Sequence, residues 1–172
     1  MLDWIFPWIA FACLAGALTL LISLSIIDLL TRLLPNVLVL PFALLGIAFH
    51  ITTAWHYLAP LNMVLGALMG FGILYGIRFI ANRIYKQDTL GLGDVKLMAA
   101  AGLWLGPDGI LMALSLGAFC GMLHGLGVAL YQSAKTGEKI NLNRLGIPAG
   151  PGFALGIILM GLYQYNLFSA GL

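Results

Sequence analysis

Two aspartates, Asp28 and Asp94, are the residues of this sequence best suited to chemistry. Asp28 directly follows residues 4–27, a run without any charged side chain, and Asp94 closes the segment Gly91-Leu92-Gly93-Asp94. Two carboxylates held close together cannot both ionise cheaply, so one keeps a proton while the other activates a water. Such a pair is sufficient for hydrolysis of a peptide bond by general acid and base catalysis, without a metal, a cofactor or a nucleophilic serine.

Each aspartate also has a structural interpretation. Asp28 would lie at the C-terminal end of a helix, where Arg32 could offset its charge as an i, i+4 partner. Asp94 could be the N-cap of the helix that follows, with glycine suited to the preceding turn. The two flanking glycines favour a functional role, because absent side chains let another backbone, such as an extended substrate, approach the carboxylate. Asp88 lies in a polar stretch without this feature and is interpreted as a solvated loop residue.

The sequence lacks the motifs that other hydrolytic mechanisms require. There is no GxSG serine segment, no HExxH and no CxxC pair. The cysteines, Cys13 and Cys120, lie far apart in apolar stretches, which predicts neither a disulfide framework nor a zinc site. The three histidines, His50, His56 and His124, are scattered, and we expect them to have packing or interface roles.

The composition is that of a membrane protein. Of 172 residues, 62% are hydrophobic and 8% are charged, whereas an ordinary soluble domain carries about 25% charged residues. Six acidic and eight basic residues cannot cover a soluble globule of this size, which excludes a cytosolic enzyme and a nucleic-acid-binding domain. The sequence therefore predicts an all-α integral membrane protein, with residues 1–172 forming a single membrane-embedded domain.

Interruptions of the apolar runs predict a bundle of about six transmembrane helices. An aromatic and polar group at 55–60 divides the longest charge-free run, and Gly106, Pro107 and Asp108 end a short helix. Small residues at the spacing of Gly66 and Gly70 favour close helix contacts. The expected helices are 5–27, 37–55, 61–81, 95–105, 109–131 and 148–168.

All eight lysines and arginines fall in or directly around the first, third and fifth connections of this bundle. By the positive-inside tendency these connections, which carry both aspartates, face the cytoplasm, and both termini lie outside. The residues are Arg32, Arg78, Arg83, Lys86, Lys96, Lys135, Lys139 and Arg144.

Three blocks of this sequence resemble the type IV prepilin peptidases, which are membrane aspartic peptidases of the GxGD type. The first block is Asp28 to Asn36, reading DLLTRLLPN, which is similar to the family's aspartate followed by a basic or polar stretch and an apolar-Pro-Asn. The second is Gly91 to Ala100, reading GLGDVKLMAA, and the third is Ile147 to Gly156, reading IPAGPGFALG. All three occur in order, and they lie on the same side of the predicted bundle.

The resemblance implies that Asp28 and Asp94 are the catalytic pair. The substrates would be prepilins or pseudopilin-like secretion proteins, cleaved at the cytoplasmic face of a prokaryotic inner membrane to remove a basic leader. The partners are then these substrates and the lipid bilayer, with no nucleic acid, metal or cofactor. Site-shaping or substrate-binding roles are expected for Gly91, Gly93, Lys96, Pro148 and Gly150.

Many bacterial members of that family carry a further region with paired CxxC motifs, which is associated with N-methylation of the new terminus. This sequence contains no such motif, so it resembles the short peptidases of tight-adherence pili and the archaeal preflagellin peptidases. The expectation is a peptidase without the methyltransferase activity.

Two other functions fit the same residues. A small proton-coupled carrier would use Asp28 and Asp94 as relay carboxylates, although carriers commonly place their sites near the middle of the membrane. An inactive assembly factor would retain the same motifs without turnover.

Overall fold

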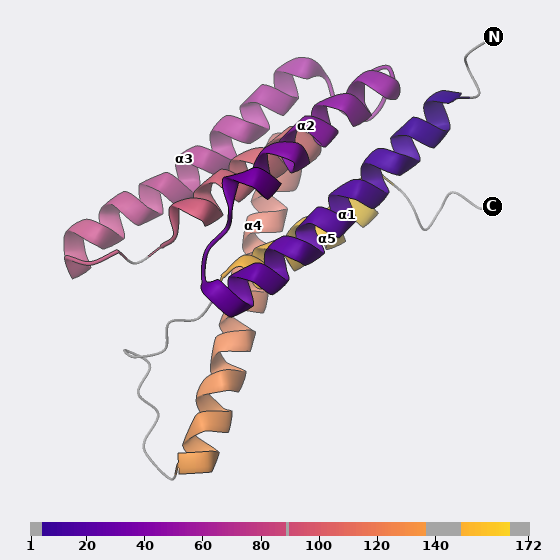
Figure 1. Ribbon diagram of the computed structural model, residues 1–172. Coiled ribbons are helices and arrows are strands. Elements are labelled where there is room, and N and C mark those ends of the chain that lie inside the picture. The colour runs from indigo at the N-terminus through magenta and orange to yellow at the C-terminus, as the bar shows by residue number, and fades with distance from the viewer. Residues whose placement is uncertain (1–4, 89, 137–148, 166–172) are drawn as a thin grey trace.

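The computed structural model describes residues 5–88, 90–136 and 149–165, and these residues form helices joined by short connections, with no strand among them (Figure 1). The expected all-α architecture is therefore confirmed for the described part of the chain. The helices are α1 (Ile5–Thr31), α2 (Asn36–Thr52), α3 (Pro60–Tyr85), α4 (Leu92–Thr136) and α5 (Gly150–Gln164).

Local backbone chemistry explains where the helices stop and start. α1 ends at Thr31 because Arg32 takes a left-handed conformation, with φ of 56°, and Pro35 then precedes α2. α2 ends at Thr52, three residues before the predicted end at 55, because Ala54 and Trp55 also have positive φ. The polypeptide therefore turns sharply before α3, which begins at Pro60.

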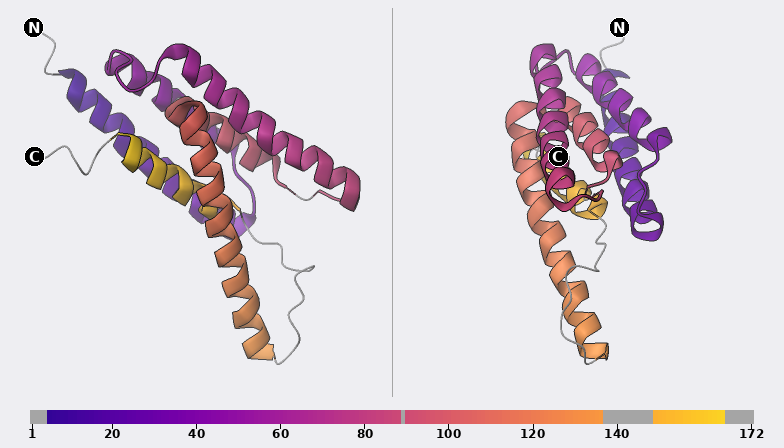
Figure 2. Two further views of the ribbon diagram at one scale, coloured as in Figure 1. Left: turned by 180° about the vertical axis from the view of Figure 1, so that it is seen from behind. Right: turned by 90° about the vertical axis from the view of Figure 1, so that its left-hand side faces the viewer.

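The expected break at Gly106 and Pro107 is confirmed within α4. Gly106 has φ of 67° and ψ of −172°, so residues 92–105 and 107–136 form two arms that run in different directions (Figure 2). Carbonyls in the last turn of the first arm need new donors at this break. The carbonyl of Trp104 accepts hydrogen bonds from His50 Nε2, at 3.2 Å, and from the Tyr165 hydroxyl. The fully buried His50 thus has the packing role that was expected.

Glycines bring α3 and the first arm of α4 into backbone contact. A Cβ added to Gly66 would lie 2.4 Å from the carbonyl oxygen of Gly102, and one added to Gly70 would lie 2.3 Å from that of Met98. Side chains at these positions would separate the two helices. The close helix contact predicted from the Gly66 and Gly70 spacing is therefore present.

The outer surface of the bundle is apolar. Leu30 and Val37 are each 79% exposed, and large apolar side chains are exposed on every helix. Three described helical segments are long and apolar enough to cross a membrane, and α2 and α5 are shorter apolar helices. These features are those of an integral membrane protein, whereas the number of six spans stays a prediction. The three long segments are Phe6–Thr31, Pro60–Tyr85 and Leu92–Tyr131.

Both candidate aspartates lie at the same end of this bundle. The C-terminal ends of α1 and α3 and the N-terminal ends of α2, α4 and α5 are located there (Figure 1). α5 lies antiparallel beside α1 (Figure 1), while the second arm of α4 extends past the other helices (Figures 1 and 2). Segments far apart in the sequence therefore meet around the two carboxylates.

Candidate active site

Asp28 is buried in the last turn of α1, where its side chain is 5% exposed. Its Oδ2 accepts a hydrogen bond of 2.9 Å from the backbone N–H of Gly150, the first residue of α5. The N-terminal end of a helix carries a partial positive charge, so α5 stabilises the carboxylate that the C-terminal end of α1 disfavours.

Arg32 does not provide the compensation that the sequence suggested. The left-handed conformation of Arg32 ends the helical geometry on which an i, i+4 side-chain pair depends, and its side chain is exposed. No ion pair joins these two described residues; only the Arg32 backbone N–H contacts Asp28, donating to its carbonyl at 2.8 Å. The i, i+4 interpretation is therefore wrong, and the partner of Asp28 lies 122 residues along the chain.

Asp94 is the third residue of α4 and not its N-cap, because the helix already begins at Leu92. Its carboxylate reaches back to accept a hydrogen bond from the backbone N–H of Gly91, as the N3 residue of a capping box does. The side chain is 8% exposed, and its Oδ1 is buried with no hydrogen-bond partner among the described residues. One oxygen of Asp94 is therefore held by backbone, and the other is buried without a hydrogen-bond partner among the described residues.

The two carboxylates are held in the same way and interact with each other. A Cβ on Gly150 would lie 2.6 Å from Asp28 Oδ2, and one on Gly91 would lie 2.9 Å from Asp94 Oδ2. Glycine at both positions thus lets a backbone N–H approach a carboxylate. Asp28 is also near enough to act on Asp94 by direct charge repulsion. The structure brings together the two aspartates that the sequence singled out.

The remaining glycine of the GxGD segment is enclosed by this chain itself. A Cβ on Gly93 would lie 2.7 Å from the Cβ of Leu34, in the connection between α1 and α2. The expectation that this glycine leaves space beside Asp94 for a substrate backbone is not supported, because Leu34 occupies that space.

Lys96 joins the first and second sequence blocks. Its Nζ donates a hydrogen bond of 3.1 Å to Oδ1 of Asn36, the first residue of α2. The side chain is exposed, so the ammonium group stays at the surface and ties α4 to the start of α2. Pro148, the other predicted site-shaping residue, lies outside the described residues.

Asp88 is exposed as expected, at 77%, but it is not simply solvated. Its Oδ1 forms an ion pair of 2.6 Å with Arg78 and accepts a hydrogen bond of 2.9 Å from Asn82 Nδ2. In the sequence, Arg78 was considered only as one of the eight basic residues, with no role of its own. The signal that marks it is a charged side chain inside an otherwise apolar helix.

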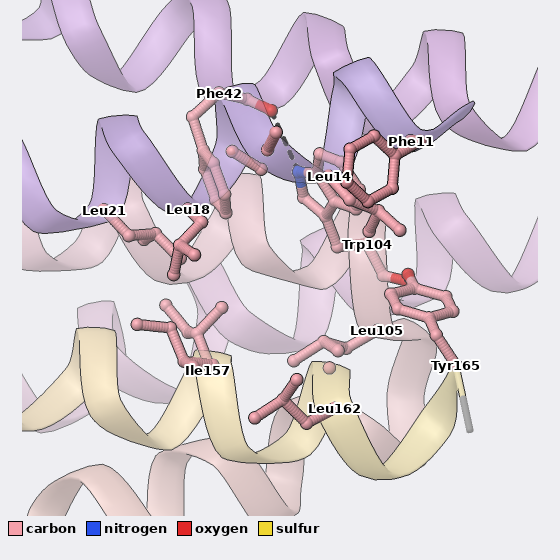
Figure 3. A pocket seen from close by; sticks show the side chains of 14 residues that line it. Phe11, Leu14, Leu18, Leu21, Phe42, Trp104, Leu105, Ile157, Leu162 and Tyr165 are labelled. Carbon is pink, nitrogen blue, oxygen red and sulfur yellow. Dashed lines mark hydrogen bonds between the residues drawn. The ribbon is translucent and has the colours of Figure 1, made fainter. Parts of the chain in front are cut away.

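A separate apolar cavity of about 270 Å³ lies between α1, α2, α4 and α5 (Figure 3). Figure 3 shows Leu18, Leu21 and Ile157 on one side of it, with Trp104 and Tyr165 at the opposite end. The Trp104 indole N–H donates to the carbonyl oxygen of Phe42 at 2.9 Å. Neither aspartate lines this cavity, so it is distinct from the two-carboxylate site.

The side chains of the site determine which chemistry it can perform. Among the described residues, no group of three or more His, Cys, Asp or Glu side chains could hold a metal ion. Two carboxylates that repel each other favour a state with one shared proton, which is a general acid and a general base side by side. Such an arrangement is able to activate a water against a carbonyl carbon.

The apolar surface and the apolar helices define a helical membrane protein, with two buried aspartates at one end of its bundle. The family model described as "Type IV leader peptidase family" matches residues 4–126, a range that includes both aspartates, and the chain belongs to this family. The resemblance seen in the sequence is thereby confirmed.

Curated relatives carry the name prepilin leader peptidase/N-methyltransferase. The protein of Escherichia coli (strain K12) is 34% identical over 139 residues, which are 80% of this chain and 57% of the relative. That of Xanthomonas campestris is 31% identical over 153 residues, 87% of this chain and 49% of the relative. The chain spans about half the length of these relatives. No solved structure matches it.

Proposed function

We propose that the protein is a membrane aspartic endopeptidase that removes the basic leader from prepilins or pseudopilin-like secretion proteins. The observation that carries the proposal is the convergence of Asp28 and Asp94, each buried and each held by a glycine N–H, at one end of an apolar bundle. Membership of the type IV leader peptidase family and the names of the relatives support the same activity.

In the proposed reaction, the aspartates share one proton. The ionised carboxylate removes a proton from a water, whose oxygen attacks the carbonyl carbon of the scissile peptide bond, while the protonated carboxyl donates its proton to the carbonyl oxygen. Collapse of the tetrahedral species breaks the C–N bond: the first carboxyl gives its proton to the leaving amine, and a hydroxyl of the tetrahedral species returns a proton to the second carboxylate as the new carboxylic acid forms. Asp94 Oδ1, which has no partner among the described residues, is the oxygen we assign to the water.

The neighbouring residues have positioning roles in this proposal. The N–H groups of Gly91 and Gly150 orient the two carboxylates. Leu34 packs directly against Gly93, and Lys96 donates a hydrogen bond to Asn36. These two contacts hold the start of α4 against the connection that follows Asp28.

The proposal is tested by co-expressing the chain with a prepilin in cells that lack any other prepilin peptidase. The prepilin should be shortened by the mass of its leader, as measured by intact-protein mass spectrometry of the membrane fraction. The control is the same prepilin in the same cells without the chain. An unshortened prepilin in membranes that contain the folded chain would contradict the proposal.

We also propose that the chain lies in the cytoplasmic membrane of a prokaryote with the aspartate end facing the cytoplasm. The basis is the distribution of lysine and arginine among the connections. Ala59 and Gln87 are exposed residues just beyond opposite ends of α3, and they therefore report on the two sides.

In a background without Cys13 and Cys120, Gln87→Cys should react with an impermeant thiol reagent only after the cytoplasmic face is opened. Ala59→Cys should react in intact spheroplasts. The reverse labelling pattern would place both aspartates on the outer side of the membrane, where they could not reach a leader in the cytoplasm.

The carrier hypothesis has less support from this geometry. Asp28 is in the last turn of α1 and Asp94 in the first turn of α4, so both lie at the ends of their helices and not midway along them. Substrate and ion sites of carriers lie near the middle of the bilayer.

A further inference from the structure

Arg78 contacts the segment that leads into Asp94. It lies near the C-terminal end of α3, with a side chain only 16% exposed. One guanidinium nitrogen donates to the carbonyl oxygen of Leu90, and the other forms the 2.6 Å ion pair with Asp88. Its fork of donors therefore binds two points of the connection between α3 and α4.

The carbonyl of Leu90 and the N–H of Gly91 belong to one peptide group. Because a peptide group is planar, a donor that fixes the orientation of its oxygen also fixes the direction of its N–H. That N–H is the one that donates to the Asp94 carboxylate. A continuous series of contacts thus runs from the Arg78 guanidinium through a single peptide group to the candidate catalytic aspartate.

We infer that Arg78 is a positioning residue for Asp94 and acts through the peptide group between Leu90 and Gly91. Glycine has wide conformational freedom, so this peptide needs an external restraint. A cation at the carbonyl oxygen also polarises the peptide and strengthens its N–H as a donor. Asp88 orients the guanidinium, and Asn82 in turn donates to Asp88.

The kinetic consequence rests on the proposed peptidase function. Loss of the restraint should misplace a carboxylate that acts in the transition state, while the contacts that bind substrate remain. We expect Arg78→Ala to lower kcat for prepilin cleavage about 10- to 100-fold, with KM changed less than about threefold. Arg78→Lys, which keeps a donor and the charge but not the fork, should recover part of the lost kcat.

Arg83→Ala is the matched control. Arg83 is on the same helix near the same end, but its guanidinium lies over the Phe79 ring, 5.8 Å from the ring centroid. This variant should keep kcat within about twofold of the wild type. An equal loss in Arg83→Ala, or wild-type kcat in Arg78→Ala, would overturn the inference.

A measurement that does not depend on enzymatic activity tests this inference separately from the proposed function. In the purified full chain, amide hydrogen exchange of the peptide covering residues 90–95 should be at least about tenfold faster in Arg78→Ala than in wild type. Exchange in the middle of α1 and α3 and the thermal midpoint should stay close to wild type, which distinguishes local release from unfolding. Unchanged exchange at 90–95, or equal acceleration throughout the chain, would refute the role of Arg78. Absence of cleavage by the wild type would refute only the proposed function.

Discussion

Asp28→Asn and Asp94→Asn are each expected to abolish leader cleavage, with kcat reduced by at least about 1,000-fold. Asparagine keeps the volume of the side chain and an oxygen that accepts the glycine N–H, but it cannot share a proton or remove one from water. The loss should therefore be catalytic, and both variants should accumulate in the membrane like the wild type. The measurement is the rate of leader removal from a purified prepilin, normalised to folded enzyme.

Asp88→Asn is the control for the aspartate variants. Its side chain is 77% exposed and bound to Arg78 and Asn82, and asparagine retains an oxygen for both contacts. We expect it to keep most of the activity, with only a small loss, because the retained oxygen still accepts from Arg78 and keeps the guanidinium oriented. Cleavage at the wild-type rate by either Asp28→Asn or Asp94→Asn would exclude the two-aspartate mechanism.

Gly150→Ala is expected to reduce kcat by at least about 100-fold, because it displaces Asp28. The new Cβ would lie 2.6 Å from Oδ2, 2.9 Å from Cγ and 3.1 Å from Cβ of Asp28, so the whole side chain must move away. Burial of Asp28 leaves little room for such a shift, and the hydrogen bond from the Gly150 N–H would be lengthened. The measurement is again kcat for leader removal, with membrane accumulation recorded for each variant.

Gly121→Ala is the matched control for a glycine substitution in a helix beside α5. A Cβ on Gly121 meets nothing within 4 Å, so alanine fits there and increases helix propensity. This variant should cleave at close to the wild-type rate. If Gly150→Ala retains wild-type kcat, Gly150 does not set the position of Asp28.

The sequence by itself determined where the apolar helices and the main breaks between them lie, to within a few residues at the helix ends, because these depend on local chemistry. Charge-free runs located the apolar helices, and Gly106 with Pro107 marked the break within α4. The same local patterns singled out Asp28 and Asp94, the family resemblance added Gly150, and the structure brings all three to one end of the bundle.

The sequence could not show which face of each helix points inward. In a membrane both the lipid and the protein interior favour apolar side chains, so burial leaves no contrast in the pattern. Leu24 is fully buried and Leu30 is 79% exposed on the same helix, although they are the same residue type. The sequence also could not predict the apolar cavity, because its lining residues come from four helices that meet only in the folded protein.

Only the tertiary structure decided the partners of the two carboxylates. The sequence offered Arg32 for Asp28, but the partner is the N–H of Gly150 at the start of α5. Leu34 fills the space beside Gly93, and Arg78 holds the peptide before Gly91. Hydrogen bonds and steric contacts act over a few ångströms in space, so they depend on helices that meet only after packing. Spacing along the chain predicts such contacts only within one helix or turn.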